Sequence, residues 1–402
     1  MNYIYLINEC SRASVYGIGT YIDQMTKCLS SISDVVLNVV EFYSVKEEYC
    51  IEEINGVFIH YVPCEKILSI TSKKKYYRNA FYVFSKNIDI CSNDKLIFHL
   101  NYNNEFYLID LIRLKWKTSF IYFTIHYQEW CFKLKGDLDR LKNIIDGNDI
   151  SDLNESVLTS FKCEKYIYDN VDKIICLSRY TDYVLKNIYN VDFNKIQLVY
   201  NGITYLETSS VNEPNAIKSK LGFDNEEKII LFVGRLDEAK GVDLLIDAFK
   251  IVLNEVPLSR LIVVGDGDFS KYYSKIVGYW NKITFTGRLD KNLLFEFYQI
   301  ADVGVMPSFH EQCSYVAIEM MMMGVPLITS DSTGLKEMQA NKEFMLKTYI
   351  NNNEMYINPD EIAEKIILAI GQDKYRFYDK CEDHINQYSF NTMSQLVYKF
   401  YY

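Results

Sequence analysis

The stretch from Ile229 to Leu245, IILFVGRLDEAKGVDLL, changes character twice along its length. It begins with an unbroken apolar run, Ile229–Val233, passes through Gly234 and a charged loop, and becomes an apolar pattern of helical period after Gly241. An unbroken apolar run predicts a strand buried on both faces, as in a parallel sheet covered by helices. The stretch therefore predicts one strand–loop–helix unit of an α/β fold.

Similar strand-like runs recur along both halves of the chain. In the first half they are Tyr3–Ile7, Val35–Val40, Leu96–Leu100, Phe120–Ile125, Ile174–Leu177 and Ile196–Val199. In the second half they are Ile229–Val233, Leu261–Val264, Ile283–Phe285, Val303–Met306 and Leu327–Thr329. Because helical patterns separate these runs, the sequence predicts two Rossmann-like, doubly wound parallel-sheet domains that face a central cleft.

The length of 402 residues also favours two domains over a single core. The polar segment Glu207–Asn215 predicts the linker between them. We expect an N-terminal domain over residues 1–205 and a C-terminal domain over residues 206–384, with a last helix over 385–402 that packs back on the first domain. The charged, weakly patterned region Lys133–Asn154 predicts either helix or a mobile insertion.

Composition excludes several classes of function. The net charge of −10 argues against a nucleic-acid partner, and the single basic run, Lys73 to Lys75, predicts a solvated loop. The ten cysteines contain no C-x-x-C pair, which indicates reduced thiols rather than a zinc site or a disulfide framework. The sequence predicts no signal peptide and contains no apolar run long enough to span a membrane. We therefore expect a cytoplasmic protein, with peripheral membrane contact left open.

The stretch HEQCSYVAIEMMMMGVP, His310 to Pro326, predicts a short helix with an anion site at its start. Ser314 is a suitable N-cap, and Gly324 followed by Pro326 ends the helix. The first amides, at Ser314, Tyr315 and Val316, would face an anion together with the positive end of the helix dipole. Glu319 lies about 6 Å further along the helix axis, roughly the offset between a diphosphate and the ribose of one nucleotide.

A second phosphate-binding pattern follows Gly234. Arg235 and Lys240 stand in the loop after that strand, where two cations can neutralise a diphosphate without a metal. In α/β sheets ligands bind beyond the carboxyl ends of the strands. Glycines and polar residues at or after the ends of the predicted strands are candidates for the same reason: Gly17, Gly19, His99, Asn101, His126, Gly234 and Arg288.

These motifs together resemble the family-4 retaining glycosyltransferases of the GT-B fold. GRLDEAKG at 234–241 is similar to the family's phosphate-binding motif. PSFHEQCSYVAIEMMMMGVPLITSDSTGLKEM at 307–338 is similar to its signature with two glutamates. VYNGI at 199–203 and FTIHYQEW at 123–130 resemble the segment before its linker and its N-domain histidine motif. Where the family has Glu-Gly-Phe-Gly, this chain has Glu311-Gln312-Cys313-Ser314.

The resemblance implies a hexosyl transfer with retention from a nucleoside-diphosphate sugar. It implies that Arg235 and Lys240 hold the diphosphate, Glu319 the ribose, and Glu311 the sugar hydroxyls. It also implies that His126 lies near the anomeric carbon, that Gly17 and Gly19 border the phosphates, and that residues 206–384 bind the donor. Cys313, Ser314, Tyr315, Gly234 and Arg288 complete the expected donor site, and His99 and Asn101 the expected acceptor side.

We expect no cofactor or metal, a UDP-, GDP- or ADP-sugar as donor, and a glycan, a lipid-linked sugar or a peptide or protein as acceptor. Cys313 as a nucleophile would need a lowered pKa, which its acidic neighbours oppose. His310, Glu311 and Glu319 match no zinc spacing. Two alternatives stay open: a sugar-nucleotide epimerase of the same architecture, and a non-catalytic nucleotide-sugar-binding partner of another transferase.

Overall fold

The computed structural model describes residues 1–10, 16–64, 70–89, 93–147, 152–204, 213–352, 354–372 and 381–402. Its contacts divide the chain into two compact units. Unit 1 consists of Met1–Trp130, Lys142–Gly202 and Phe390–Tyr402, and unit 2 of Cys131–Leu141 and Ile203–Ser389. Most of the predicted linker, residues 207–212, lies outside the described residues, and its last two positions begin the helix α8 (Pro214–Lys220).

Unit 1 is built on one mainly parallel sheet, whose strand order over the described residues is β3-β4-β2-β1-β5-β6-β7-β8. Its strands are β1 (Asn2–Glu9), β2 (Val35–Ser44), β3 (Cys50–Ile54), β4 (Val57–Pro63), β5 (Lys95–Leu100), β6 (Phe120–Ile125), β7 (Lys173–Cys176) and β8 (Ile196–Leu198). Among the described strands of this sheet, only the β3–β4 pair is antiparallel. The strands run outward in both directions from the β1–β5 pair, which is the doubly wound order of a Rossmann fold.

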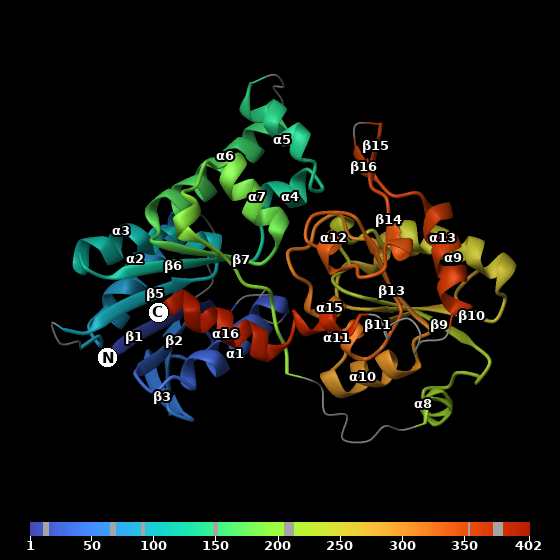
Figure 1. The fold of residues 1–402 in the computed structure, drawn as a ribbon, viewed down its shortest axis with the longest axis horizontal. Helices are drawn as coiled ribbons and strands as arrows, with labels where there is room; N and C mark the ends of the chain where they lie inside the picture. Colours follow the sequence, from blue (N-terminus) through green and yellow to red (C-terminus); the bar gives the residue numbers. More distant parts are fainter. Residues whose placement is uncertain are drawn as a thin grey trace. The chain divides into compact units, whose positions relative to one another are not determined.

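Helices connect these strands and cover the sheet (Figure 1). They are α1 (Gly17–Ser30), α2 (Ile70–Ser85), α3 (Phe106–Lys115), α6 (Asp152–Asn170), α7 (Arg179–Asn187) and the C-terminal α16 (Phe390–Tyr401). Helix α1 packs against α16, and α2 packs against α3. The last helix is anchored at its end, because Lys95 and Lys173 donate to the carbonyl oxygens of Tyr401 and Phe400.

Two local predictions for this half of the chain need correction. No strand was predicted between residues 50 and 63, where β3 and β4 form a hairpin. Asn55 and Gly56, at φ 53° and 78°, supply its left-handed turn, so the Asn-Gly pair was the missed signal. Lys73 to Lys75 lie in helix α2 and not in a loop. For Lys133–Asn154 the helical alternative is confirmed in part: α5 (Leu138–Ile145) lies within it, between α4 (Glu129–Lys133) and α6, and residues 134–137 and 146–147 are not helical.

Unit 2 repeats the doubly wound plan with a fully parallel sheet in the order β11-β10-β9-β12-β13-β14. The strands are β9 (Lys228–Val233), β10 (Ser259–Val264), β11 (Ile283–Gly287), β12 (Val303–Met306), β13 (Leu327–Ser330) and β14 (Met345–Leu346). The helices are α8, α9 (Val242–Glu255), α10 (Lys291–Ile300), α11 (Tyr315–Met322), α12 (Leu335–Met338), α13 (Pro359–Ile370) and α15 (Glu382–Asn386). A short antiparallel hairpin joins β15 (Tyr349–Asn351) to β16 (Glu354–Tyr356). The predicted α/β fold with two doubly wound parallel sheets is confirmed.

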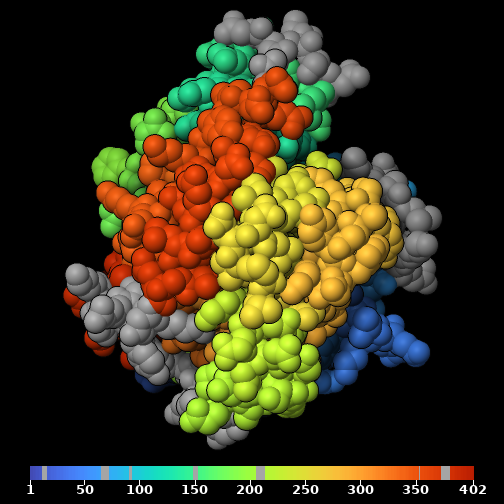
Figure 2. Space-filling model, turned by 90° about the vertical axis from the view of Figure 1, so that its right-hand side faces the viewer, coloured from blue at the N-terminus to red at the C-terminus, as the bar shows by residue number. Residues whose placement is uncertain are grey.

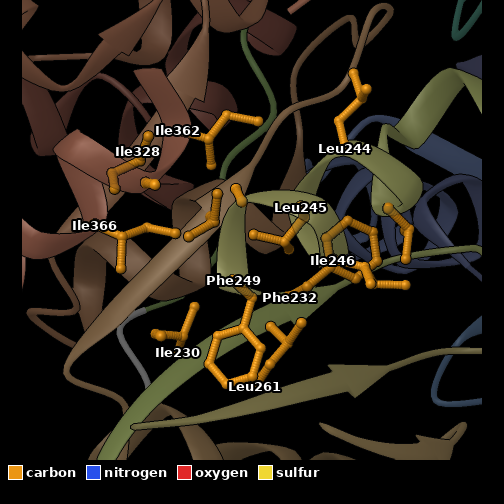
Figure 3. Close-up of a cluster of buried hydrophobic side chains, with 14 of the residues drawn as sticks. Ile230, Phe232, Leu244, Leu245, Ile246, Phe249, Leu261, Ile328, Ile362 and Ile366 are labelled. Atoms are coloured by element: carbon orange, nitrogen blue, oxygen red, sulfur yellow. The ribbon is translucent and has the colours of Figure 1, made fainter. Parts of the chain in front are cut away.

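The core of unit 2 explains why its strand segments are apolar throughout. Leu245 and Phe249 of α9 point toward Ile230 of β9 and Leu261 of β10 (Figure 3). Ile366 of α13 belongs to the same buried cluster. Helix α13 packs against α9, and the two reach the surface side by side in Figure 2. Burial of both sheet faces removes polar alternation from the strands, which is the pattern read from the sequence.

No helix in the described part of the chain is long and apolar enough to cross a membrane.

Candidate functional site

The topology of unit 2 brings its two predicted phosphate-binding loops to one place. The strand order reverses between β9 and β12, which are neighbours in the sheet. The loop from Gly234 to Gly241 leaves β9, and the loop from Pro307 to Ser314 leaves β12. Ligands of doubly wound sheets bind at this switch point, beyond the carboxyl ends of the strands. The fold therefore places both motifs where a nucleotide is expected.

Backbone contacts hold these two loops together. The Phe309 amide donates to the Ala239 carbonyl oxygen at 2.7 Å. Gly241 adopts φ 66°, and a Cβ on it would lie 2.4 Å from the Pro307 carbonyl oxygen. Only glycine satisfies both the left-handed backbone and this close approach. The position of Gly241 in the sequence motif is thus explained by packing of one loop on the other.

Lys240 and Glu311 form an ion pair across the joined loops. Their side chains are 11% and 17% exposed, so most of the pair is removed from water. The resemblance assigned the lysine to the diphosphate and the glutamate to the sugar. The structure instead pairs them with each other, 71 residues apart in sequence. A donor that binds here would have to share or separate two opposite charges that already satisfy one another.

The loop after β13 fixes the backbone of Glu311. Its amide donates to Thr333 Oγ1 at 3.0 Å, and its carbonyl oxygen accepts from the Gly334 amide at 2.9 Å. A Cβ on Gly334 would lie 1.7 Å from the Gln312 carbonyl oxygen. Thr333 and Gly334 were not among the predicted site residues. The signal for them was the single glycine before Leu335 in the signature.

We expect Gly334→Ala to displace the Glu311 loop and to lower the free energy of unfolding by about 1–3 kcal/mol, the usual cost of overpacking. The backbone of Gly334 is in the right-handed region, so the added methyl group rather than backbone strain causes the loss. Gly371→Ala is the matched control, because a Cβ there meets nothing closer than 3.6 Å. Denaturant unfolding of both variants measures the difference. Equal stability of the two would contradict the packing argument.

Arg235 is the more exposed of the two predicted cations. Its guanidinium lies 5.8 Å from the Phe132 ring centre and 3.3 Å from Asp237 Oδ2, with 38% of the side chain exposed. Phe132 in turn packs edge-on against His310, at 5.1 Å between ring centres. An arginine stacked on an aromatic ring keeps its N–H groups in a defined plane, which suits forked binding of phosphate oxygens.

His310 lies next to Glu311 in this site, and the sequence analysis did not assign it to the donor site. It is buried, and neither ring nitrogen has a hydrogen-bond partner among the described residues. Burial, followed by the charges of Lys240 and Arg235, lowers the pKa of His310 to about 3. The imidazole is therefore neutral at physiological pH. Its burial beside two cations shows how tightly this end of unit 2 is packed.

Helix α11 largely follows its prediction. Ser314 is the N-cap and its hydroxyl accepts from the Ala317 amide at 3.3 Å, while Gly324 is left-handed at φ 69°. The Ser314 amide, however, is not free, because it donates to Met338 Sδ at 3.3 Å. Sulfur is a weak acceptor. The anion site predicted here therefore loses one of its three amides in this state, and Tyr315 and Val316 stay as predicted contacts.

Glu319, on the same helix, accepts a hydrogen bond from the buried Tyr298 hydroxyl at 2.9 Å. Burial raises the pKa of Glu319, and the Tyr298 hydrogen bond and the charge of Lys291 oppose that rise. Tyr298 comes from α10 and was absent from the sequence prediction. It holds the carboxylate that the resemblance assigns to the ribose. Cys313, just before α11, is buried.

The remaining predicted donor residues of unit 2 lie on neighbouring strand ends. The Gly234 amide donates to the Val264 carbonyl oxygen, and the Gly265 amide to that of Gly287, each at 2.9 Å. These bonds align the ends of β9, β10 and β11. Arg288 follows directly and is exposed. No three potential metal-ligating side chains gather among the described residues.

In unit 1 the candidate residues gather around Asn101. Its Nδ2 donates to the carbonyl oxygens of Ile7 at 2.9 Å and His99 at 3.3 Å, so its Oδ1 must be the acceptor for His126 Nε2 at 3.1 Å. The proton of the neutral imidazole is therefore on Nε2, and Nδ1 is left as an acceptor. Burial, together with His99, lowers the pKa of His126 to about 3. His126 can accept a hydrogen bond from a hydroxyl group.

His99 has a different environment from the one expected. It is fully buried, its Nδ1 is paired with the Tyr401 hydroxyl of α16, and its Nε2 lies 2.7 Å from Thr124 Oγ1. Thr124 Oγ1 is also hydrogen-bonded to the Tyr21 hydroxyl at 2.8 Å, and the Tyr21 ring packs edge-on against His126. With both nitrogens occupied, His99 is suited to positioning this network rather than to touching an acceptor.

Gly17 and Gly19 were predicted as a phosphate-bordering loop. Gly17 instead begins helix α1, and Gly19 lies in its first turn. Residues 11–15, just before them, lie outside the described residues. Glycines in a first turn leave the helix amides uncovered by side chains, so the predicted phosphate contact keeps a physical basis in the helix rather than in a loop.

Comparison with known proteins supports one family for unit 2. Residues 214–386 match the model of the family described as Glycosyl transferases group 1. An uncharacterized glycosyltransferase of Methanocaldococcus jannaschii is 30% identical over 233 residues, covering 56% of this chain and 58% of the relative. The chain spans about half the length of the curated relatives that it matches. The group 1 glycosyltransferase family is thus supported, most directly for residues 214–386.

Solved structures show the fold of the whole chain. Sucrose-phosphate synthase from Thermosynechococcus elongatus superposes with a TM-score of 0.75 at 18% identity, covering 100% of this chain and 98% of that one. Anabaena HepE in complex with UDP-glucose gives 0.68 at 14% identity, covering 98% of each. The fold of the chain is therefore the GT-B fold of these structural neighbours.

Proposed function

We propose that the protein transfers a hexosyl group, with retention of configuration, from a nucleoside-diphosphate sugar to a hydroxyl group of a glycan, a lipid-linked sugar or a peptide. The observation that carries the proposal is the Lys240–Glu311 pair at the switch point of unit 2. A cation and a carboxylate held side by side can divide one donor between them. The cation takes the diphosphate, and the carboxylate takes the hydroxyls of the attached sugar.

Arg235 and the first turn of α11 would complete the diphosphate site, and Glu319, held by Tyr298, would bind the ribose. Gly234, Arg288, Cys313, Ser314 and Tyr315 would form the rest of the donor pocket. Two cations and a helix start are enough to stabilise a leaving diphosphate by fixed charge. The donor base stays open among UDP, GDP and ADP. UDP-glucose, bound by the Anabaena neighbour, is the first candidate to test.

The proposed reaction needs no side chain as a nucleophile. The bond between the anomeric carbon and the diphosphate oxygen breaks while the acceptor oxygen approaches on the same face of the sugar. The departing phosphate oxygen takes the proton of the acceptor hydroxyl, and the nucleoside diphosphate leaves with it. Charge stabilisation and positioning supply the catalysis. His126, with its free Nδ1 lone pair, would accept a hydrogen bond from a hydroxyl near the anomeric centre.

Incubation with a panel of UDP-, GDP- and ADP-hexoses, with and without EDTA, tests the proposal. We expect one donor to release its nucleoside diphosphate and yield a glycosylated product by mass spectrometry, at a rate that EDTA scarcely changes. Activity lost to EDTA and restored by Mg²⁺ or Mn²⁺ would contradict the electrostatic account. A changed sugar nucleotide without any acceptor would indicate an epimerase instead.

A further inference from the structure

Two buried carboxyl groups lie at the switch point of unit 1. The strand order of this sheet reverses between β1 and β5, which are neighbours. Glu9 is the last residue of β1, and Glu105 ends the short 3-10 helix η2 (Asn103–Glu105) that follows β5. Glu9 is 4% exposed and Glu105 is fully buried. Glutamate side chains are almost never fully buried without a partner, so both groups need an explanation.

The hydrogen bonds of the two groups come from the backbone and from a tyrosine. Glu105 Oε2 accepts from the Asn101 amide at 2.6 Å and from the Tyr102 amide at 3.1 Å. The Tyr77 hydroxyl of α2 donates to Glu9 Oε1. Glu105 Oε1 is buried and has no hydrogen-bond partner among the described residues. One oxygen atom of Glu105 therefore fixes the turn after β5.

The two carboxyl groups do not both carry a charge at neutral pH. Burial raises the pKa of Glu9 to about 7, and the Tyr77 hydrogen bond and the charge of Lys73 oppose the rise. Burial, followed by the charge of Glu9, raises the pKa of Glu105 well above its ordinary value, and the two backbone amides oppose this rise. Two buried acids that repel each other keep at least one proton between them, and the more deeply buried Glu105 holds it.

The other titratable groups around the pair agree with this charge state. They are tyrosines whose pKa burial raises above the ordinary value, so that they are neutral: Tyr43 of β2, Tyr76 and Tyr77 of α2, and Tyr127 after β6. Lys73 of α2 acts on Glu9 and favours its charged form. The proton therefore stays on Glu105.

Glu105 is connected to His126 through Asn101. The Asn101 amide donates to Glu105, and Asn101 Oδ1 accepts from His126 Nε2 at 3.1 Å. Asn101 Nδ2 is fixed separately, since it donates to the carbonyl oxygen of Ile7 on β1 at 2.9 Å. The backbone bond to Glu105 and the side-chain bond to Ile7 together set the place of Asn101 Oδ1. That place decides which imidazole nitrogen carries the proton and how the ring is turned.

We propose that Glu105 is a positioning residue of the acceptor side, which holds His126 in the Nε2-protonated tautomer through Asn101. This role rests on the proposed transfer reaction, in which His126 Nδ1 accepts a hydrogen bond from a hydroxyl group near the anomeric centre. Glu105 is fully buried, so it acts through Asn101 and not on the substrate. A neutral acid suits this task, because its carbonyl oxygen accepts both amide protons without an uncompensated buried charge.

Substitutions of Glu105 test the proposal through kcat and KM. Glu105→Ala removes the acceptor of both amides, and we expect kcat to fall by about 10-fold or more, because a small displacement at a reacting centre is costly. The KM for the donor should change little, since the proposed donor residues lie in unit 2. Glu105→Gln keeps a neutral side chain with the same carbonyl oxygen and should retain most of kcat. If Glu105→Ala does not fold, Glu105→Met replaces it, because methionine fills the space and accepts no amide proton.

Nitrogen NMR of isotope-labelled histidine tests the same claim without any substrate. The chain has 5 histidines, and His126→Gln identifies the signals of His126. We expect a protonated Nε2 in the unchanged protein and in Glu105→Gln, and mixed tautomers in Glu105→Ala and Glu105→Met. This result stands even if the transfer reaction is not found. A tautomer that Glu105→Ala and Glu105→Met leave unchanged would overturn the proposal, as would an equal loss of kcat in Glu105→Gln and Glu105→Ala.

The pH dependence of stability tests the neutral state of Glu105. The folded pair keeps protons that the unfolded chain releases in the ordinary carboxyl range, so its contribution to stability is present at low pH. This contribution is lost as the pH rises through the raised pKa values, of which that of Glu9 is about 7. Between about pH 5 and pH 7 the unfolding free energy should therefore fall more steeply in the unchanged protein than in Glu9→Gln/Glu105→Gln. Equal slopes would overturn the proposal.

Glu227→Ala is the matched control for Glu105→Ala. Glu227 is 5% exposed, and its carboxylate also accepts a backbone amide, that of Asp224 at 3.0 Å. It lies just before the amino end of β9, whereas the donor loop leaves the carboxyl end of that strand. Glu227→Ala should keep the kcat and the His126 tautomer of the unchanged protein, with folding checked by circular dichroism. A loss of kcat equal to that of Glu105→Ala would contradict a specific role for Glu105.

Discussion

Replacing Lys240 with alanine is expected to reduce turnover of the donor by about 100-fold or more. The leaving diphosphate gains negative charge in the transition state, and Lys240 is the less exposed of the two cations that we propose bind it. The substitution also leaves Glu311 as an unpaired carboxylate next to an anionic ligand. Both effects act in the same direction. Release of nucleoside diphosphate at saturating donor measures the change.

Lys250→Ala is a suitable control for Lys240→Ala. Lys250 also sits in unit 2 and pairs with a carboxylate, Asp247 at 3.3 Å, but it lies on helix α9 away from the joined loops. It should keep nearly full turnover, because a surface pair contributes little. Near-normal turnover in Lys240→Ala, with the donor bound as in the unchanged protein, would show that Lys240 does not stabilise the leaving diphosphate.

The second large effect is expected for Glu311→Gln, which keeps the size of the side chain and removes its charge. We expect kcat to fall by about 100-fold or more while the affinity for the donor changes little. Glu311 would orient the reacting sugar ring, and an interaction that matters mainly in the transition state lowers kcat rather than raising KM. Glu354→Gln, which alters a more exposed pair with Lys135, should leave both constants unchanged.

Because Lys240 and Glu311 touch, their substitutions should not be independent. The double variant Lys240→Ala/Glu311→Gln is expected to lose much less than the product of the two single losses, since each single change already breaks the pair. Losses that multiply would mean that the two side chains act separately, and that the ion pair plays no part in holding the donor site.

The sequence predicted most of the fold because each buried strand is apolar throughout and each strand is followed by a helical pattern. Phe120–Ile125 and Val303–Met306 begin and end where predicted. The hairpin of β3 and β4 was not predicted because β3 is largely exposed and has no buried residue. The capping of α11 by Ser314 could be read locally, since all of its determinants lie within a few residues.

Contacts between distant segments could not be read in the same way. The pairing of Lys240 with Glu311 depends on β9 and β12 being neighbours in the sheet. The burial of His99 depends on α16 bringing Tyr401 onto it from the far end of the chain. A side chain at Gly334, in the loop after β13, would collide with the Gln312 carbonyl oxygen, which lies in the loop after β12. Residue types at strand ends identified the candidates, and packing between those ends decided their partners.

The most direct test of the account is the anomeric configuration of the transfer product, measured by proton NMR with a donor of known configuration. In the proposed reaction, fixed charge surrounds the diphosphate, and the departing oxygen takes the acceptor proton on the same face of the sugar. It predicts a glycosylated product whose anomeric proton shows the configuration of the donor. A product with the opposite configuration would contradict it.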